Sequence, residues 1–283
     1  MFPTPIEQAG RSAQWLYRVV LAVALVVWLL PLLAVALTSI RGSADIFAGN
    51  YWGWPTEWRV VENYRAVFTD TPLARYLVNT CLITLPAVIG AVALSCMAGY
   101  ALGVYRFRLN LPVFFLFLAG NFVPFQILMI PVRLMSLQLG LYNSVPGLVL
   151  FHVAFNTGFC TFFMRNFIIE LPRELIEAAR MDGATEFQVF YKVVLPLVRP
   201  AMAAISVLVF TFVWNDYFWA TVLVQGDHAM PVTAGLKTLS GIWVAQWHLV
   251  AAGSIVAALP PVLIFFFKQK HFIAGLTMGA TKG

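Results

Sequence analysis

The sequence predicts an all-α membrane protein with six transmembrane helices and a helix-turn-helix loop on one side of the membrane. Of its 283 residues, 61% are hydrophobic and 11% are charged, and one water-soluble core could not hide that much apolar surface. The apolar residues form runs of about 20 or more, the length that crosses a hydrocarbon layer of about 30 Å as a helix. Barrel strands are excluded, because these runs are too long and too uniformly apolar.

The distribution of basic residues predicts how the spans are oriented. The six apolar runs cover 16–40, 76–104, 111–132, 143–164, 200–224 and 249–268. Most of the 18 Lys and Arg residues lie near the chain ends and in segments 105–110 and 165–199. Because basic residues favour the cytoplasmic side, both termini and the 165–199 loop are predicted to be cytoplasmic. The expected organisation is a cytoplasmic segment at 1–15, a membrane domain at 16–268 and a cytoplasmic tail at 269–283.

Composition and motifs exclude several functions. The net charge of +6 does not indicate a nucleic-acid partner, because the basic residues sort to one side of a membrane. Cys81, Cys96 and Cys160 fall in predicted spans, so neither a disulfide nor a metal cluster is expected. The chain has no phosphate-binding GxxxxGK motif and no nucleophile elbow. We therefore expect no catalytic residues, no metal and no cofactor bound by this chain.

The segment after the first span is predicted to rest on the outer membrane surface. Residues 41–75 should contain a short surface helix around 60–68, and Trp52, Trp54 and Trp58 fit an interfacial belt.

The second span carries small residues at every fourth position. They are Ala87, Ala91, Ser95, Gly99 and Gly103. Such a face lets another helix approach closely, so we expect tight helix packing there.

The third and fourth spans contain polar residues at membrane depth. Gln126 lies between Pro124 and Pro131 in the third span, and His152 and Asn156 share a face of the fourth. Proline frees a backbone carbonyl, which is tolerated where neighbouring helices or a water-filled cavity can satisfy it. For Gln126 and Asn156, lining a solute path and hydrogen bonding between helices are equally good interpretations, whereas His152 is interpreted as structural.

The fifth span contains the cluster Trp214, Asn215 and Asp216. With a rise of about 1.5 Å per residue, Asp216 should lie about 24 Å from Pro200, in the outer part of the bilayer. An ionised carboxylate there should face protein or water rather than lipid. A role in the solute path and a role as a structural hydrogen-bond acceptor both remain open.

The charged stretch from Glu170 to Pro196 is predicted to form two short helices joined by a turn. Pro172 suits the first position of one helix, Leu171 and Leu175 recur at helical spacing, and Gly183 can adopt the left-handed conformation that ends it. Thr185 and Gln188 fit a capping box that starts the second helix. An apolar face is expected from Phe187, Phe190, Tyr191 and Val194, and Pro196 should close the helix.

The residues of this stretch resemble a known family. Glu177, Ala178 and Ala179, then Asp182, Gly183 and Ala184, and later Leu195, Pro196 and Pro200, resemble the cytoplasmic coupling loop of permease subunits in binding-protein-dependent ABC importers. The tail from Phe272 to Gly283 and the exit of the second span at 98–108 resemble the carbohydrate-uptake branch, the maltose-type permeases. The resemblance covers about 75–283.

This resemblance implies a function and a set of partners. The loop, with Phe187 and Pro196 among its contact residues, would dock in a cleft of an ATPase subunit that uses ATP and Mg. The chain would form a heterodimer with a second permease in a bacterial plasma membrane and carry half the path of a sugar, while its 225–248 loop meets an extracytoplasmic solute-binding protein. The candidate path residues are Gln126, Asn156, Trp214, Asn215 and Asp216.

Two other functions compete with this one. An ion-coupled secondary transporter would need inverted repeats and several buried ionisable residues, and the sequence offers one Asp and no convincing repeat. A membrane-embedded assembly subunit without transport is excluded only by partner and flux data.

Overall fold

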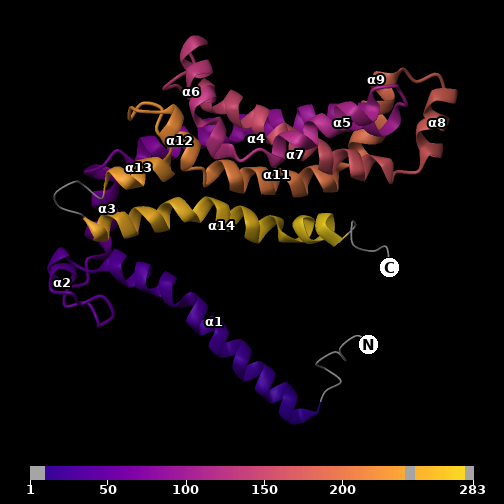
Figure 1. Ribbon diagram of the computed structural model, residues 1–283. Helices are drawn as coiled ribbons and strands as arrows, with labels where there is room; N and C mark the ends of the chain where they lie inside the picture. Colours follow the sequence, from indigo (N-terminus) through magenta and orange to yellow (C-terminus); the bar gives the residue numbers. More distant parts are fainter. Residues whose placement is uncertain (1–9, 240–245, 278–283) are drawn as a thin grey trace. The chain divides into compact units, whose positions relative to one another are not determined.

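The computed structural model describes residues 10–239 and 246–277, and within these ranges it is built of helices (Figure 1). The helices divide into two compact units, one formed by residues up to Thr71 with Leu239–Val256 and the other by Pro72–Thr238 with the residues from Ala257 onward. Four helices are long and apolar enough to cross a membrane, and six spans result if two sharply bent helix pairs each count as one. The predicted all-α membrane fold is confirmed.

The first unit contains three helices and the start of a fourth. They are α1 (Arg11–Ile40), α2 (Ser43–Phe47), α3 (Val60–Thr69) and the first turns of α14 (Trp247–Thr277). The Asn63 side chain ties α3 to the end of α1 by donating to the carbonyl oxygens of Ser39 and Arg41, each at 2.9 Å. The predicted surface helix is therefore present, and the three tryptophans before it are exposed.

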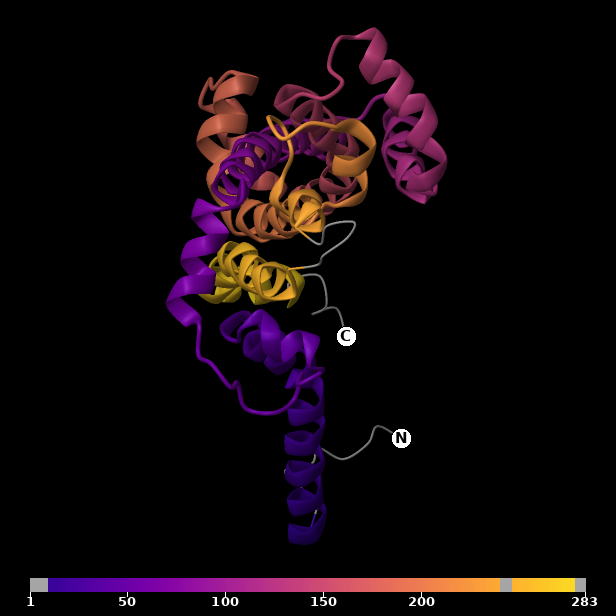
Figure 2. The ribbon, with the colours of Figure 1, turned by 90° about the vertical axis from the view of Figure 1, so that its left-hand side faces the viewer.

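The second unit is organised around the long helices α4 (Leu73–Val104), α7 (Val145–Ile169) and α11 (Arg199–Trp214), which run alongside one another (Figures 1 and 2). The small-residue face of α4 packs against α7. Ala87, Ala91 and Ser95 are fully buried, and a Cβ added at Gly99 would lie 2.9 Å from the backbone nitrogen of Arg165. The close approach predicted for this face is confirmed.

Short helices occupy the two ends of this bundle (Figure 1). At one end lie α8 (Arg173–Met181), α9 (Glu186–Gln188) and α10 (Leu195–Leu197), and at the other α12 (Phe218–Leu223) and α13 (Val232–Thr238). The predicted 165–199 loop therefore forms one end of the bundle.

The third predicted span is not a continuous helix, which corrects that expectation. It consists of α5 (Asn110–Ala119), two 3₁₀ turns at Gly120–Phe122 and Phe125–Leu128, and α6 (Met129–Gln138). The two arms meet at 91°. Pro124 causes the break, because the residue before a proline is driven to extended backbone, and Val123 has φ −75° and ψ 121°.

The fifth predicted span, 200–224, is also interrupted. Helix α11 ends at Trp214, and α12 begins at Phe218 after a polar break at Asn215–Tyr217. The side chains of Asn215 and Asp216 bond to backbone groups at this point, which offers the chain an alternative to continuing the helix. Helix α11 runs unbroken from Arg199 to Trp214 and Asp216 follows directly after its C-cap, so the distance of about 24 Å from Pro200 stays a prediction.

Candidate functional site

The first candidate site is the loop at 165–199, whose turn follows the predicted chemistry. Helix α8 starts at Arg173 with Pro172 as its N-cap, one residue later than predicted. Gly183 has φ +80° and nothing within 4 Å of the position its Cβ would take, so backbone conformation rather than space requires glycine there. The capping box is confirmed: the Thr185 N–H donates to Gln188 Oε1 at 2.9 Å, and the Gln188 N–H donates to Thr185 Oγ1 at 3.3 Å.

The second half of the loop differs from the prediction. After α9 the chain forms a π-helix at Val189–Val194, and Pro196 lies inside the last helical turn, α10, instead of closing the helix. The wider turn of the π-helix places two of the four expected apolar residues towards the bundle and two towards the surface. Phe190 contacts Tyr100 and Val194 is buried, whereas Phe187 and Tyr191 stack on each other and are 73% and 60% exposed.

The first half of the loop also buries a different residue from the one expected. Ile176 is 6% exposed and faces the core of the unit, whereas Leu175 is 44% exposed.

Several predicted coupling residues are brought together in a groove. A cavity of about 250 Å³ is lined by Ala179, Asp182, Gly183, Ala184 and by residues of the second half of the loop. Glu177, Ala178 and Phe187 are exposed and lie outside this groove, and Pro196 is half-buried and also outside it. The loop therefore presents a groove that carries both an acidic and a basic residue, Asp182 and Lys192, with exposed side chains beside it.

One loop residue that the sequence did not single out fixes this end of the bundle. Glu186 Oε2 accepts hydrogen bonds from Tyr100 Oη at 3.0 Å and Tyr105 Oη at 2.5 Å. Arg180 Nε donates to Oε1 of the same carboxylate at 2.8 Å. The hydrogen bonds from Arg180 and Tyr105 lower the pKa of Glu186 to about 2. The carboxylate thus joins α8 and α9 to the end of α4.

The second candidate site is an open cavity of about 460 Å³ on the same unit, with buried and exposed residues in its lining. Its walls come from the bend after α5, from α7, from the end of α11 and from the break before α12. The aromatic lining residues are Phe125, Phe155, Phe159, Phe212, Tyr217, Phe218 and Trp219, and the polar ones are Asn121, His152, Asn156, Asn215 and Asp216.

Asp216 is the centre of this polar wall. Its Oδ1 accepts the Trp219 N–H at 3.2 Å, and its Oδ2 accepts the Ala220 N–H at 3.0 Å, so it caps α12. His152 Nε2 lies 3.5 Å from Oδ2. The sequence reasoning missed this pair, although an acid and a histidine in two apolar runs were a signal for it. Asn156 lies on the same face as His152, as expected, and its Nδ2 donates to the His152 carbonyl oxygen at 2.8 Å.

The structure separates the five candidate path residues. Asn156, Asn215 and Asp216 line the 460 Å³ cavity, whereas Trp214 and Gln126 do not. Trp214 is 3% exposed and its Nε1 donates to the Ala257 carbonyl oxygen at 3.0 Å, which is a packing contact with α14. Gln126 is exposed in the 3₁₀ turn that follows Pro124.

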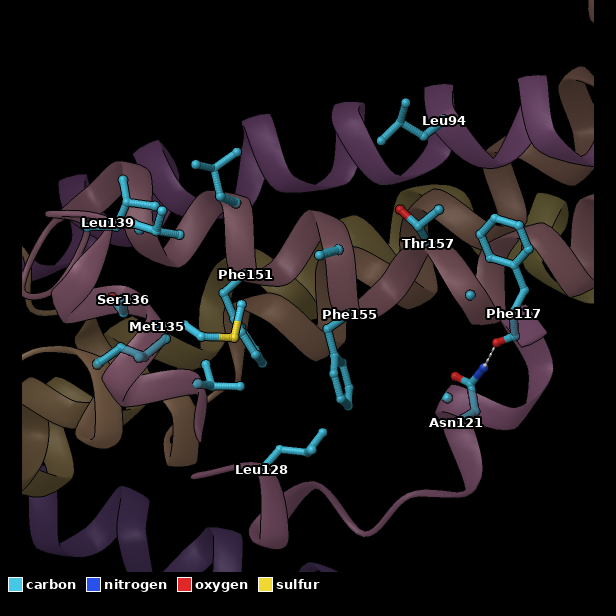
Figure 3. Close-up of a pocket in the computed structure, with 18 of the residues that line it drawn as sticks. Leu94, Phe117, Asn121, Leu128, Met135, Ser136, Leu139, Phe151, Phe155 and Thr157 are labelled. Carbon is cyan, nitrogen blue, oxygen red and sulfur yellow. Dashed lines mark hydrogen bonds between the residues drawn. The ribbon is translucent and has the colours of Figure 1, made fainter. Parts of the chain in front are cut away.

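A larger cavity of about 670 Å³ lies between the bent α5–α6 segment and α7. Figure 3 shows Leu128, Met135, Phe151 and Phe155 around it, with Asn121 turned back to the Phe117 carbonyl oxygen at 3.0 Å. Its lining is almost entirely apolar. This cavity offers few hydrogen-bonding groups to a polar solute, which leaves the 460 Å³ cavity as the better candidate for one.

Comparison with known proteins places the chain in a family. Residues 91–277 match the model of the binding-protein-dependent transport system inner membrane component. The arabinooligosaccharides transport system permease protein of Halalkalibacterium halodurans is 33% identical and covers 95% of this chain and 96% of its own length. The melibiose/raffinose/stachyose import permease protein of Bacillus subtilis is 30% identical, with 90% and 91% covered.

A solved structure of an ABC transporter contains a chain with a similar fold. The crystal structure of a bacterial ABC transporter involved in import of the acidic polysaccharide alginate contains a chain that is 26% identical to this one. The match has a TM-score of 0.80 and covers 95% of this chain and 100% of that one. With two relatives at 30% identity or more, the protein belongs to the family of binding-protein-dependent transport system inner membrane components, the permease subunits of ABC importers.

Proposed function

We propose that this permease subunit moves a carbohydrate, an oligosaccharide or a related glycoside or polyol, through the 460 Å³ cavity beside Asp216. The observation that carries the proposal is the lining, because aromatic faces beside a few amide and carboxylate groups suit the apolar faces and hydroxyl groups of a sugar. The oligosaccharide names of the two relatives support it.

The proposed complex has four kinds of subunit. This chain pairs with a second permease, two ATPase subunits bind on the cytoplasmic side, and a solute-binding protein meets the 225–248 loop. ATP and Mg are used by the ATPase subunits. Closure of the ATPase pair moves the coupling loops, and the permease pair then alternates between inward-open and outward-open states.

The proposed orientation places both chain termini in the cytoplasm of a bacterial cell, with the 165–199 loop on the same side. It follows from the positive-inside distribution of Lys and Arg. Two exposed positions test it, Phe47 at 74% and Met181 at 88% exposure. In a chain without its native cysteines, Phe47→Cys should react with a membrane-impermeant reagent from outside and Met181→Cys should not. The reverse pattern would invert the topology.

Docking of the ATPase is tested by a charge reversal at an exposed position outside the groove. Glu177→Lys should reduce co-purification of the ATPase, while the amount of chain in the membrane stays as in the unmodified protein. Glu174→Lys, on an exposed position of the same helix, is the matched control. Equal loss of ATPase binding and membrane insertion would indicate misfolding instead.

Reconstitution decides between this function and its rivals. In liposomes the purified chain should move no sugar down a proton or sodium gradient, and uptake should require the second permease, the ATPase, ATP and the binding protein together. Uptake driven by a gradient alone would support a secondary transporter. Assembly of the whole complex without uptake of any sugar would favour an assembly subunit.

A further inference from the structure

We propose that the cavity beside Asp216 admits uncharged saccharides and rejects those that carry carboxylate, phosphate or sulfate groups. The inference rests on the proposed function, since it takes this cavity as part of the solute path. It adds the charge class of the substrate, which neither the fold nor the resemblance to sugar permeases decides.

The first step is the charge of the cavity wall. None of the residues that line it is Lys or Arg, and the acid–base pair on the wall is Asp216 with His152. With Asp216 ionised, this pair carries one negative charge when His152 is neutral and none when His152 is protonated. Neither state gives the wall a positive charge.

One basic residue, Lys237, lies beside a residue of this wall. Lys237 approaches the wall from α13, with its ammonium group 5.7 Å from the centroid of the Tyr217 ring. Tyr217 itself lines the cavity, but Lys237 does not. Lys237 therefore contacts a lining residue without being part of the wall.

An anionic sugar would lose hydration free energy when it enters this cavity. A charged group that leaves water is stabilised in a protein only when it meets an opposite charge and hydrogen-bond donors. In this cavity a uronate would meet aromatic rings, three asparagine amides and the Asp216–His152 pair, in which the carboxylate already lies beside the imidazole. A neutral sugar meets partners that suit it, because its hydroxyl groups can donate to the carboxylate and exchange hydrogen bonds with the amides.

The comparison with a solved relative sharpens this step. A transporter for acidic alginate has a chain with the same fold, so the fold as such does not exclude anionic cargo. In this chain the side chains that line the cavity exclude anionic saccharides. Replacing one of them by lysine should therefore let an anionic saccharide bind.

The experiment uses the assembled importer in detergent, with this chain carrying Phe212→Cys and no native cysteine. Phe212 lines the cavity and is 59% exposed. The probes are a neutral arabino-oligosaccharide, raffinose and an alginate oligosaccharide of equal length. A neutral probe should slow thiol labelling about tenfold at saturation, because a bound ligand buries most of the wall it contacts, and the alginate probe should not slow it.

A second variant places a cation in the cavity. Asn121→Lys changes a lining residue, whereas Phe122→Lys changes its neighbour, which is 78% exposed and outside the cavity. Asn121→Lys should let the alginate probe protect the cysteine at a concentration about tenfold lower than in the control. If Asn121→Lys does not fold, Asn215→Lys introduces the charge at the end of α11 instead.

The outcomes separate the two proposals. Equal protection by neutral and alginate probes in the unmodified lining would overturn the charge selection while leaving the sugar path in place. The charge selection would also be overturned if the Asn121→Lys variant folds and is still protected by neutral probes but not by the alginate probe. If no saccharide of either charge protects the cysteine or is taken up, the proposed function fails and this inference falls with it.

Discussion

The 165–199 loop and the cavity are each organised around one carboxylate, and the two carboxylates are held in different ways. Glu186 is 48% exposed and is held by the side chains of Arg180, Tyr100 and Tyr105. The Asp216 side chain is 13% exposed, and backbone N–H groups of α12 and His152 surround it. A side chain held by charged partners should depend on its charge, whereas a helix cap should depend mainly on its shape.

The largest effect is expected at the turn of the loop. Gly183→Asp puts a Cβ on a residue at φ +80°, which costs about 1 kcal/mol or more and tilts α8 against α9. Sugar uptake should fall about tenfold or more at normal membrane levels.

Gly183→Asn is the matched control for the added charge, because Asn puts the same Cβ at φ +80° and tolerates the left-handed region as Asp does. It should lower uptake less than Gly183→Asp, and the difference between the two variants measures the effect of the carboxylate. A Gly183→Asp protein that binds its ATPase and transports at the unmodified rate would remove this turn from the coupling mechanism.

The next effect should come from Glu186→Gln. The substitution keeps the shape but removes the charge that attracts Arg180 and strengthens the hydrogen bonds from Tyr100 and Tyr105, so the contacts of α9 with α8 and with the end of α4 weaken. We expect uptake per ATP hydrolysed to fall about threefold, because hydrogen bonds to charged groups contribute about 1.5–3 kcal/mol when buried and less at this exposure. ATPase co-purification should be unchanged. Loss of co-purification would make Glu186 a docking residue rather than a link.

The charge of Glu186 also predicts a pH dependence. Its pKa is about 2 in the folded protein against an ordinary 4.5, so the contact contributes stability above pH 4.5 and loses it as the pH falls through about 2. Cleavage of the loop by an acid protease should stay slow near pH 5 and rise towards pH 2. In Glu186→Gln the loop should be cleaved readily near pH 5 already. A rise in the unmodified protein near pH 5 would contradict the depressed pKa.

The smallest effect is expected from Asp216→Asn. The amide keeps one acceptor for the N-terminus of α12, so uptake of a neutral sugar should change by less than about twofold. Asp216→Ala, which removes both acceptors, is the control and should lower the amount of folded protein. A strong loss of uptake in Asp216→Asn at normal protein levels would show that the charge itself serves transport.

The same contrast explains what could be predicted from the sequence. The turn at Gly183, the Thr185–Gln188 capping box and the small-residue face of α4 depend on neighbours along the chain or on a simple repeat, and all three are confirmed. The link from Glu186 to Tyr100 and the pair of His152 with Asp216 join residues that are distant in sequence. No spacing rule indicates such contacts.

The errors also have a physical cause. The breaks after α5 and α11 lie inside runs that hydropathy reads as continuous, because polar side chains and Pro124 redirect the backbone without changing the average hydropathy. The π-helix at Val189–Val194 shifts the spacing of the residues after Phe187, so an apolar face predicted with the ordinary helical period is split.

The close fit of α4 on α7 also gives the bundle a mechanical property. With 32 residues, α4 is about 48 Å long, and backbone contact at Gly99 leaves little room for the two helices to slide. A tilt of about 5° about the midpoint of such a rod moves each end by about 2 Å. Glu186 is hydrogen-bonded to one end of α4 through Tyr100, and α7 carries His152 and Asn156 further along. The two helices thus form a stiff lever, and a small movement at the 165–199 loop would change hydrogen-bond distances at the cavity.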